Sequence, residues 1–137
     1  MQALPGYARR EMALCVLVIA MLAAGVGTYL VKDEQQRRTV AMAMTGGDPA
    51  RAPVLFRRYG CGGCHAIPGI DGADGKVGGP LGGLRERVYI AGVVNNTPGN
   101  LTRWIVNPQQ FSPRTAMPAT GISREEARDL AAYLYAQ

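Results

Sequence analysis

The sequence predicts an all-α protein that begins with one membrane-spanning helix and continues into a small helical domain. The twenty residues from Met12 to Val31 carry no charged side chain, and at about 1.5 Å per residue they would span about 30 Å of hydrocarbon. After this run, apolar residues recur at helical spacing in short segments. No stretch alternates apolar and polar residues as a half-buried strand would.

The apolar run has two interpretations, an uncleaved anchor or a cleaved signal peptide. Arg9 and Arg10 give a charged start, and Ala23-Ala24 loosely suggests a cleavage site. The run is longer than the roughly 7–15 residues of a signal core, which favours the anchor. We expect four parts, namely a cytoplasmic tail at 1–11, an anchor helix at 12–31, a juxtamembrane linker at 32–47 and a domain at 48–137.

Within residues 48–137 the pattern predicts three helices around one long loop. Asp48-Pro49 is typical of a helix cap followed by the first helical residue. Helices are expected at about 54–59, at 100–106 and after the capping box at 123–126. Residues 67–83 contain seven glycines and two prolines, so they predict a loop, to which a bound cofactor would have to supply a core.

The segment YGCGGCHAIP, residues 59–68, holds Cys61, Cys64 and the single histidine, His65. A structural zinc site usually needs two such cysteine pairs, and the third cysteine, Cys15, lies in the apolar run. A redox dithiol is expected beside a βαβ pattern, which the flanking residues lack. Cys-x-x-Cys-His is typical of covalent haem c attachment, with two thioether bonds and an imidazole ligand from one helical turn. We therefore predict one covalently attached haem c.

With His65 on one face of the iron, the candidates for the other face are Met117, Lys76 and water. Met117 lies in a loop between two predicted helices and is the one methionine of residues 48–137. A methionine often only fills a gap in a core, but ligation is the favoured interpretation here. A His/Met pair fills both axial positions and raises the haem potential, which suits electron transfer and leaves no position for dioxygen or peroxide.

Residues 48–137 resemble class I cytochrome c. The motifs are CGGCH, Gly79-Pro80-Leu81-Gly82, a central Trp104, Met117-Pro118 and the closing helix LAAYLYAQ. The run NNTPGNLTRWIVNPQQFSPRTAMP is similar to the cytochrome c domain fused to subunit II of some haem-copper oxidases. Here the domain is expected on a single helix without the copper-binding domain, which leaves open whether the chain is a subunit, a donor or a carrier for another complex.

The resemblance implies roles for three further residues. The Pro80 carbonyl would accept a hydrogen bond from the free ring nitrogen of His65. Trp104 and Arg87 would face the haem propionates. Simple core packing is the alternative for Trp104, and a solvated surface charge is the alternative for Arg87.

The predicted function is one-electron transfer by a membrane-anchored c-type cytochrome that is not an enzyme by itself. We expect it to be the haem subunit of, or the electron donor to, a respiratory terminal oxidase. One alternative is the haem subunit of a nitric oxide reductase or a periplasmic dehydrogenase. Another is a haem sensor or peroxidase with a labile sixth ligand.

Charge and location complete the expectations. The formal net charge is +5, with five positive and three negative side chains in residues 1–38 and ten positive and seven negative in residues 39–137. This balance suits an acidic partner or anionic lipid, and the scattered arginines are not a nucleic-acid footprint. The expected partners are the bilayer and a membrane respiratory complex, above all a haem-copper oxidase, with no nucleic acid and no small-molecule substrate. Basic residues flank the run on both sides, so charge does not decide the orientation. Haem attachment does, because it suits the outer side of the membrane. We therefore expect a single pass through a bacterial cytoplasmic (inner) membrane, with the N-terminus cytoplasmic and the haem domain periplasmic.

Overall fold

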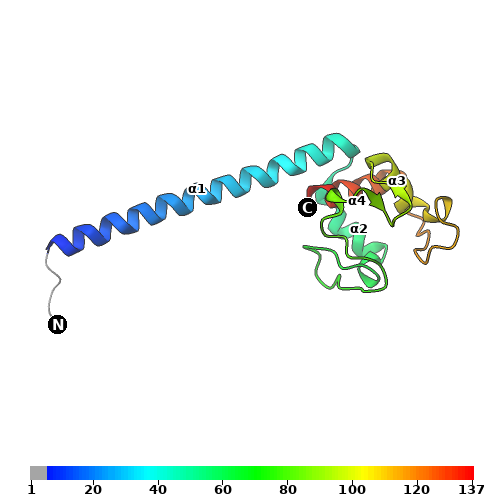
Figure 1. The fold of residues 1–137 in the computed structure, drawn as a ribbon, viewed down its shortest axis with the longest axis horizontal. Helices are drawn as coiled ribbons and strands as arrows, with labels where there is room; N and C mark the ends of the chain where they lie inside the picture. The colour runs from blue at the N-terminus through cyan, green and yellow to red at the C-terminus, as the bar shows by residue number, and fades with distance from the viewer. Residues whose placement is uncertain (1–5) are drawn as a thin grey trace. The chain divides into compact units, whose positions relative to one another are not determined.

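The computed structural model describes residues 6–137, which form helices, short 3-10 turns and one small hairpin (Figure 1). The elements in order are α1 (Gly6–Thr45), η1 (Pro49–Arg51), α2 (Ala52–Arg58), η2 (Cys61–Gly63), η3 (Leu84–Glu86), β1 (Tyr89–Ile90), β2 (Val94–Asn95), α3 (Pro98–Val106), η4 (Pro108–Gln110) and α4 (Arg124–Ala136). The chain divides into two compact units, Met1–Gln35 and Gln36–Gln137. Each is described by itself.

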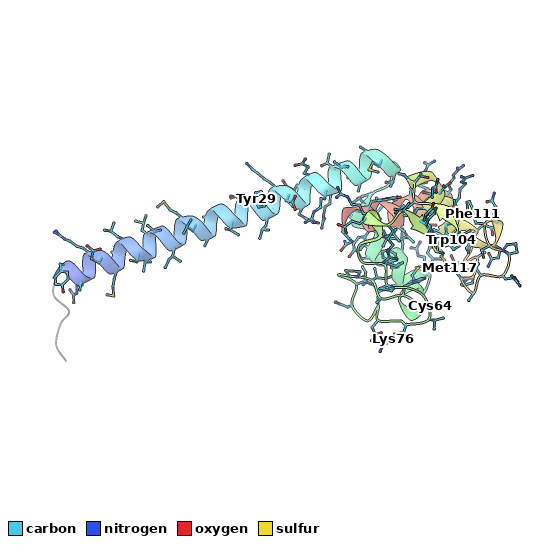
Figure 2. The ribbon with its side chains drawn as sticks, viewed as in Figure 1. Tyr29, Cys64, Lys76, Trp104, Phe111 and Met117 are labelled. Atoms are coloured by element: carbon cyan, nitrogen blue, oxygen red, sulfur yellow. The ribbon has the colours of Figure 1, made fainter. Side chains whose placement is uncertain are left out.

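The first unit is helix α1 up to Gln35. Its apolar side chains are exposed along the whole predicted anchor, and Figure 2 shows them, Tyr29 among them, standing clear of the helix. Of the described residues, Tyr7–Thr45 form the one helix that is long and apolar enough to cross a membrane. Apolar side chains exposed all around a helix require a covering, which lipid would provide.

The second unit begins inside α1, ahead of the expected domain start at residue 48. Ala41 is 1% exposed and Thr45 is also buried. Gly46, at φ 68°, ends the helix, and Gly47 then lies so close to α4 that a built Cβ would be 2.5 Å from the Asp129 backbone nitrogen. Residues 36–47, expected in a linker, therefore belong to the compact unit that contains the domain.

A buried carboxylate of α4, Asp129, holds the segment that follows α1, at Asp48. The backbone nitrogen of Asp48 donates to Asp129 Oδ1 at 2.7 Å, and Arg51 Nη1 lies 3.3 Å from Asp129 Oδ2. Asp129 is only 2% exposed, and a charge so deeply buried requires such partners. The predicted cap is confirmed, because the Asp48 side chain accepts from the Ala50 nitrogen at 2.9 Å, with Pro49 as the first residue of η1.

The three predicted helices are confirmed as α2, α3 and α4. Thr97 caps α3 by accepting from the Asn100 nitrogen, and the capping box of α4 joins Ser123 and Glu126 in both directions. Helix α4 packs against α2, α3 and η1, and the ring of Phe56 meets the ring of Tyr133 edge-on at 5.4 Å. Their apolar faces make one core.

The fold is mostly helical, as predicted, with one addition. Strands β1 and β2 pair antiparallel, Tyr89 with Asn95 and Ile90 with Val94. Two residues per strand are too few to produce a readable alternation, so this hairpin could not be predicted from periodicity. No helix or named strand interrupts residues 67–83, so the glycine-rich segment is a loop as expected.

Candidate functional site

The cysteines and the histidine lie on one tight turn that follows α2. Gly60, at φ 67°, redirects the chain, a backbone conformation that favours glycine. The backbone nitrogens of Cys64 and His65 both donate to the Cys61 carbonyl, at 3.2 and 3.0 Å. This single turn brings both thiols and the imidazole to one region, as the spacing predicts.

The glycine-rich loop packs directly on this turn. Gly75 N donates to Gly62 O at 3.1 Å, and Gly78 N donates to Cys64 O at 2.8 Å. A Cβ built on Gly62 would lie 2.8 Å from the Ala73 side chain. Glycine inside the Cys-x-x-Cys pair is therefore required by the approach of the loop.

The loop also fixes the imidazole. His65 Nδ1 lies 2.7 Å from the carbonyl oxygen of Gly79. Because a carbonyl only accepts, Nδ1 carries the proton and Nε2 keeps its lone pair for a metal. The sequence-based expectation placed this bond on Pro80, and that assignment is wrong by one residue.

Pro80 has a different partner, Arg87. The guanidinium donates from Nη2 to the carbonyls of Pro80 at 2.6 Å and Gly82 at 2.9 Å. Because the Pro80 carbonyl already receives a charged donor, its neighbour Gly79 is the one that serves His65. Arg87 thus braces the loop that orients the imidazole.

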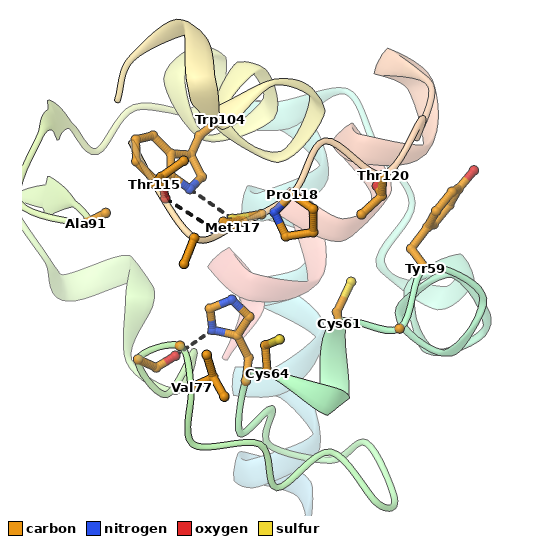
Figure 3. A pocket seen from close by; sticks show the side chains of 15 residues that line it. Tyr59, Cys61, Cys64, Val77, Ala91, Trp104, Thr115, Met117, Pro118 and Thr120 are labelled. Atoms are coloured by element: carbon orange, nitrogen blue, oxygen red, sulfur yellow. Dashed lines mark hydrogen bonds between the residues drawn. The ribbon is translucent and has the colours of Figure 1, made fainter. Parts of the chain in front are cut away.

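Met117 lies on the opposite wall, next to Trp104 (Figure 3). The indole nitrogen of Trp104 donates to Met117 Sδ at 3.2 Å. Gln109 Nε2 donates to the Met117 carbonyl at 2.8 Å, and Met117 N donates to Thr115 Oγ1 at 3.3 Å. Helix α3 and η4 therefore hold a thioether that sits in a loop.

The two walls enclose a slot made of two adjoining hollows of about 260 and 150 Å³. Both hollows are lined by the same six residues, Cys61, His65, Gly79, Ala91, Trp104 and Met117. Arg87 lines the inner hollow, whereas Cys64 lines the outer one, where Figure 3 shows it across from Met117. Two thiols, one imidazole and one thioether thus converge on a single apolar space.

Zinc is not supported by this donor set. In the part of the chain that the structure describes, no group of three or more His, Cys, Asp or Glu side chains comes together as a metal site. A tetrahedral zinc centre needs four such ligands.

Comparison with known proteins decides the family. The Cytochrome c family model matches residues 49–136. The chain belongs to the cytochrome c family. It is 38% identical over 81 residues to cytochrome c oxidase subunit 2 of Alkalihalophilus pseudofirmus, a match that covers 58% of this chain and 23% of the relative. It is 35% identical over 100 residues to cytochrome c of Theileria annulata, covering 64% of this chain and 84% of the relative.

The resemblance read from the motifs is therefore confirmed. The chain spans about a quarter of the oxidase subunit's length and most of the length of the Theileria cytochrome c. No solved structure matches the chain. Members of the family bind haem c and carry electrons, and the slot of this cytochrome c domain fits that group in its donors and in its apolar lining.

The other two residues expected to contact haem, Trp104 and Arg87, also lie at the slot. Trp104, expected at the propionates, is 6% exposed and gives its N–H to Met117, so core packing and a polar contact coexist. Arg87 is exposed, yet it is engaged with two loop carbonyls. Neither alternative from the sequence described these bonds.

Sequence reasoning missed a polar cluster behind Cys61. Tyr59 lines the outer hollow and donates its hydroxyl to Glu126 at 2.8 Å, while Arg58 pairs with the same carboxylate at 2.9 Å. The Tyr59 bond, followed by the Ser123 bonds, lowers the pKa of Glu126, and the Glu126 bond raises the pKa of Tyr59. Burial raises the pKa of the Cys61 thiol. Tyr59 lies two residues before Cys61, and this position was the one signal available for it.

Proposed function

We propose that this cytochrome c domain carries one haem c, attached through Cys61 and Cys64, with iron held between His65 Nε2 and Met117 Sδ. The observation that carries the proposal is the convergence of these four side chains on one slot, although Met117 is far from the motif in sequence. Trp104 and Arg87 complete the haem-contacting set. The function is one-electron transfer.

The side chains of this chain set the conditions for that transfer. Haem c, when bound, supplies a one-electron couple between ferrous and ferric iron. The Gly79 carbonyl fixes the tautomer of His65. With both His65 and Met117 holding the iron, the haem would offer no open site to dioxygen or peroxide. Cys64 is exposed, which puts this side of the slot at the surface where a partner can dock.

We propose further that α1 anchors the domain in the bacterial cytoplasmic membrane, with the N-terminus cytoplasmic and the haem periplasmic. Anchoring keeps the domain in the membrane plane and raises its effective concentration at a membrane partner. The partner proposed is a haem-copper respiratory oxidase. This chain would be either a subunit of that oxidase or its electron donor. Support comes from the oxidase subunit 2 relative and from the length and apolar surface of α1.

The haem proposal is tested on the full-length protein in membranes. Haem should stay with the chain on a denaturing gel, and the Cys61→Ser/Cys64→Ser double variant should lose it. The ferric wild type should show the weak far-red absorption band of thioether ligation, and Met117→Leu should lose the band and gain carbon monoxide binding. A high-spin wild type that binds carbon monoxide would instead favour the sensor or peroxidase alternative.

The partner proposal needs a separate experiment. After gentle solubilisation, an affinity-tagged chain should co-purify with copper-containing oxidase subunits, or should be reoxidised in membranes in an oxygen-dependent, cyanide-sensitive way. Co-purification with a dehydrogenase or a nitric oxide reductase would replace the oxidase proposal. Release of the chain by alkaline carbonate would contradict the anchor.

A further inference from the structure

Met117 lies in a segment with little support of its own. Between η4 and α4, residues 111–123 form no helix or strand in the described chain. A thioether on such a segment keeps its place only if other elements hold it. The holding contacts therefore determine how firmly Met117 faces the slot.

Among the residues that the structure describes, Gln109 makes the one side-chain bond that reaches the backbone of Met117 from outside its loop. Its Nε2 donates to the Met117 carbonyl at 2.8 Å. Thr115, by contrast, belongs to the same loop and moves with it. The Trp104 bond reaches the sulfur, but Trp104 is also a core residue that packs beside Phe111 with ring centroids 5.9 Å apart.

Gln109 lies on a turn that is fixed by burial and by backbone hydrogen bonds. Its neighbour Pro108 is fully buried, and the Pro108 carbonyl accepts from Phe111 N at 3.1 Å and Ser112 N at 3.0 Å. These bonds close the short turn η4, which follows α3 directly at Asn107 and packs against that helix. A donor on such a buried turn that bonds the carbonyl of a loop residue is arranged to position that residue.

We propose that Gln109 is a positioning residue that holds Met117 in place as an iron ligand. The inference rests on the proposed ligation by Met117 and adds to it the residue that governs how often the thioether leaves. Without the amide donor, the Met117 carbonyl would accept a hydrogen bond from water instead, and the state in which the thioether has left the iron becomes more populated. An added ligand that can bind only after the thioether leaves gains apparent affinity in proportion to that population.

The experiment uses the full-length haem protein in detergent and imidazole as the competing ligand. Gln109→Leu should bind imidazole about three- to tenfold more tightly than the wild type, the change expected for one lost hydrogen bond. Gln109→Glu keeps the length of the side chain but offers no donor at neutral pH, so it should show at least the same increase. Gln110→Leu, at the exposed neighbouring glutamine of the same turn, should match the wild type.

The outcomes separate this inference from the proposed function. If the wild type lacks the far-red band, ligation by Met117 fails and the inference fails with it. If the wild type shows the band but Gln109→Leu and Gln110→Leu bind imidazole equally, only the role of Gln109 is overturned. A Gln109→Glu protein that behaves as the wild type would also overturn it, because the donor would then be irrelevant. Melting temperatures show whether each variant is folded before its affinity is compared.

Discussion

Replacing Gly78 by alanine should displace the imidazole, because this glycine touches the ring. A Cβ built on Gly78 would lie 2.5 Å from His65 Nδ1 and 2.8 Å from Nε2, whereas ordinary contact begins at 3.4 Å. The loop cannot easily retreat, since Gly78 N is bonded to Cys64 O at 2.8 Å. The ring must therefore withdraw by at least 0.9 Å, the difference between 3.4 and 2.5 Å, because its Cε1 atom lies closer still to the added Cβ.

A shift of that size breaks the bond that orients the ring. Moving away from the loop lengthens the 2.7 Å contact between Nδ1 and Gly79 O toward about 3.6 Å, which is no longer a hydrogen bond. Losing this partly exposed bond costs about 0.5–1.5 kcal/mol. For a domain of this size each kcal/mol lowers the melting temperature by roughly 4–8 °C.

The measurement is haem content per chain in membranes together with the melting temperature of the solubilised protein. Gly99→Ala is the matched control, because Gly99 lies in α3 away from the slot and a Cβ built on it meets nothing within 4 Å. Gly78→Ala should lose haem or melt lower, and Gly99→Ala should not. Equal haem content and equal melting temperatures in the two variants would refute this account of the imidazole.

Three further predictions concern stability. Gly47→Ala should lower the free energy of unfolding by more than the roughly 1–3 kcal/mol of ordinary overpacking, because its Cβ would meet the backbone at Asp129. Thermal melting measures this loss. The lowered pKa of Glu126 means that its bonds stabilise the fold above the usual carboxyl pKa of about 4.3. The difference in unfolding free energy between wild type and Glu126→Gln should therefore close as pH falls through and below that value, which denaturant titration measures. Burial raises the pKa of Tyr135 to about 12, so the contribution of Tyr135 to stability is present below pH about 10 and is lost as pH rises toward 12. Tyr135→Phe should lose less stability than the wild type over that window, as measured by denaturation monitored by circular dichroism.

The helices and the haem motif were predictable because each carries a local signal. The capping box at Ser123 and the Cys-x-x-Cys-His spacing are read within a few residues, and the structure forms both as expected. The slot was predictable in its donors, since His65 and Met117 are the one histidine of the chain and the one methionine of residues 48–137. Burial of Ala41 and Thr45 could not be predicted, because it depends on where the chain turns after Thr45.

The hydrogen-bond partners were beyond the sequence for a different reason. Whether Gly79 or Pro80 faces His65 depends on a rotation of one peptide in a loop without periodicity. Gln109 gave no signal, because a glutamine in a short turn is as compatible with solvent as with a carbonyl. Such choices are made by tertiary geometry, after the helices are placed.

The two walls of the slot are built in different ways, and this difference ranks their firmness. The His65 wall is backbone laid on backbone, fixed by glycines that allow close approach and tied to α4 where Tyr133 donates to Pro68 O at 2.7 Å. The Met117 wall hangs on single side-chain donors from α3 and η4. Freeing the thioether requires only these two side-chain bonds to break, whereas freeing the imidazole requires the loop to leave the turn. Departure of Met117 is therefore the opening that this architecture makes easiest, and the side chains that grip its loop are where evolution or mutation would tune it.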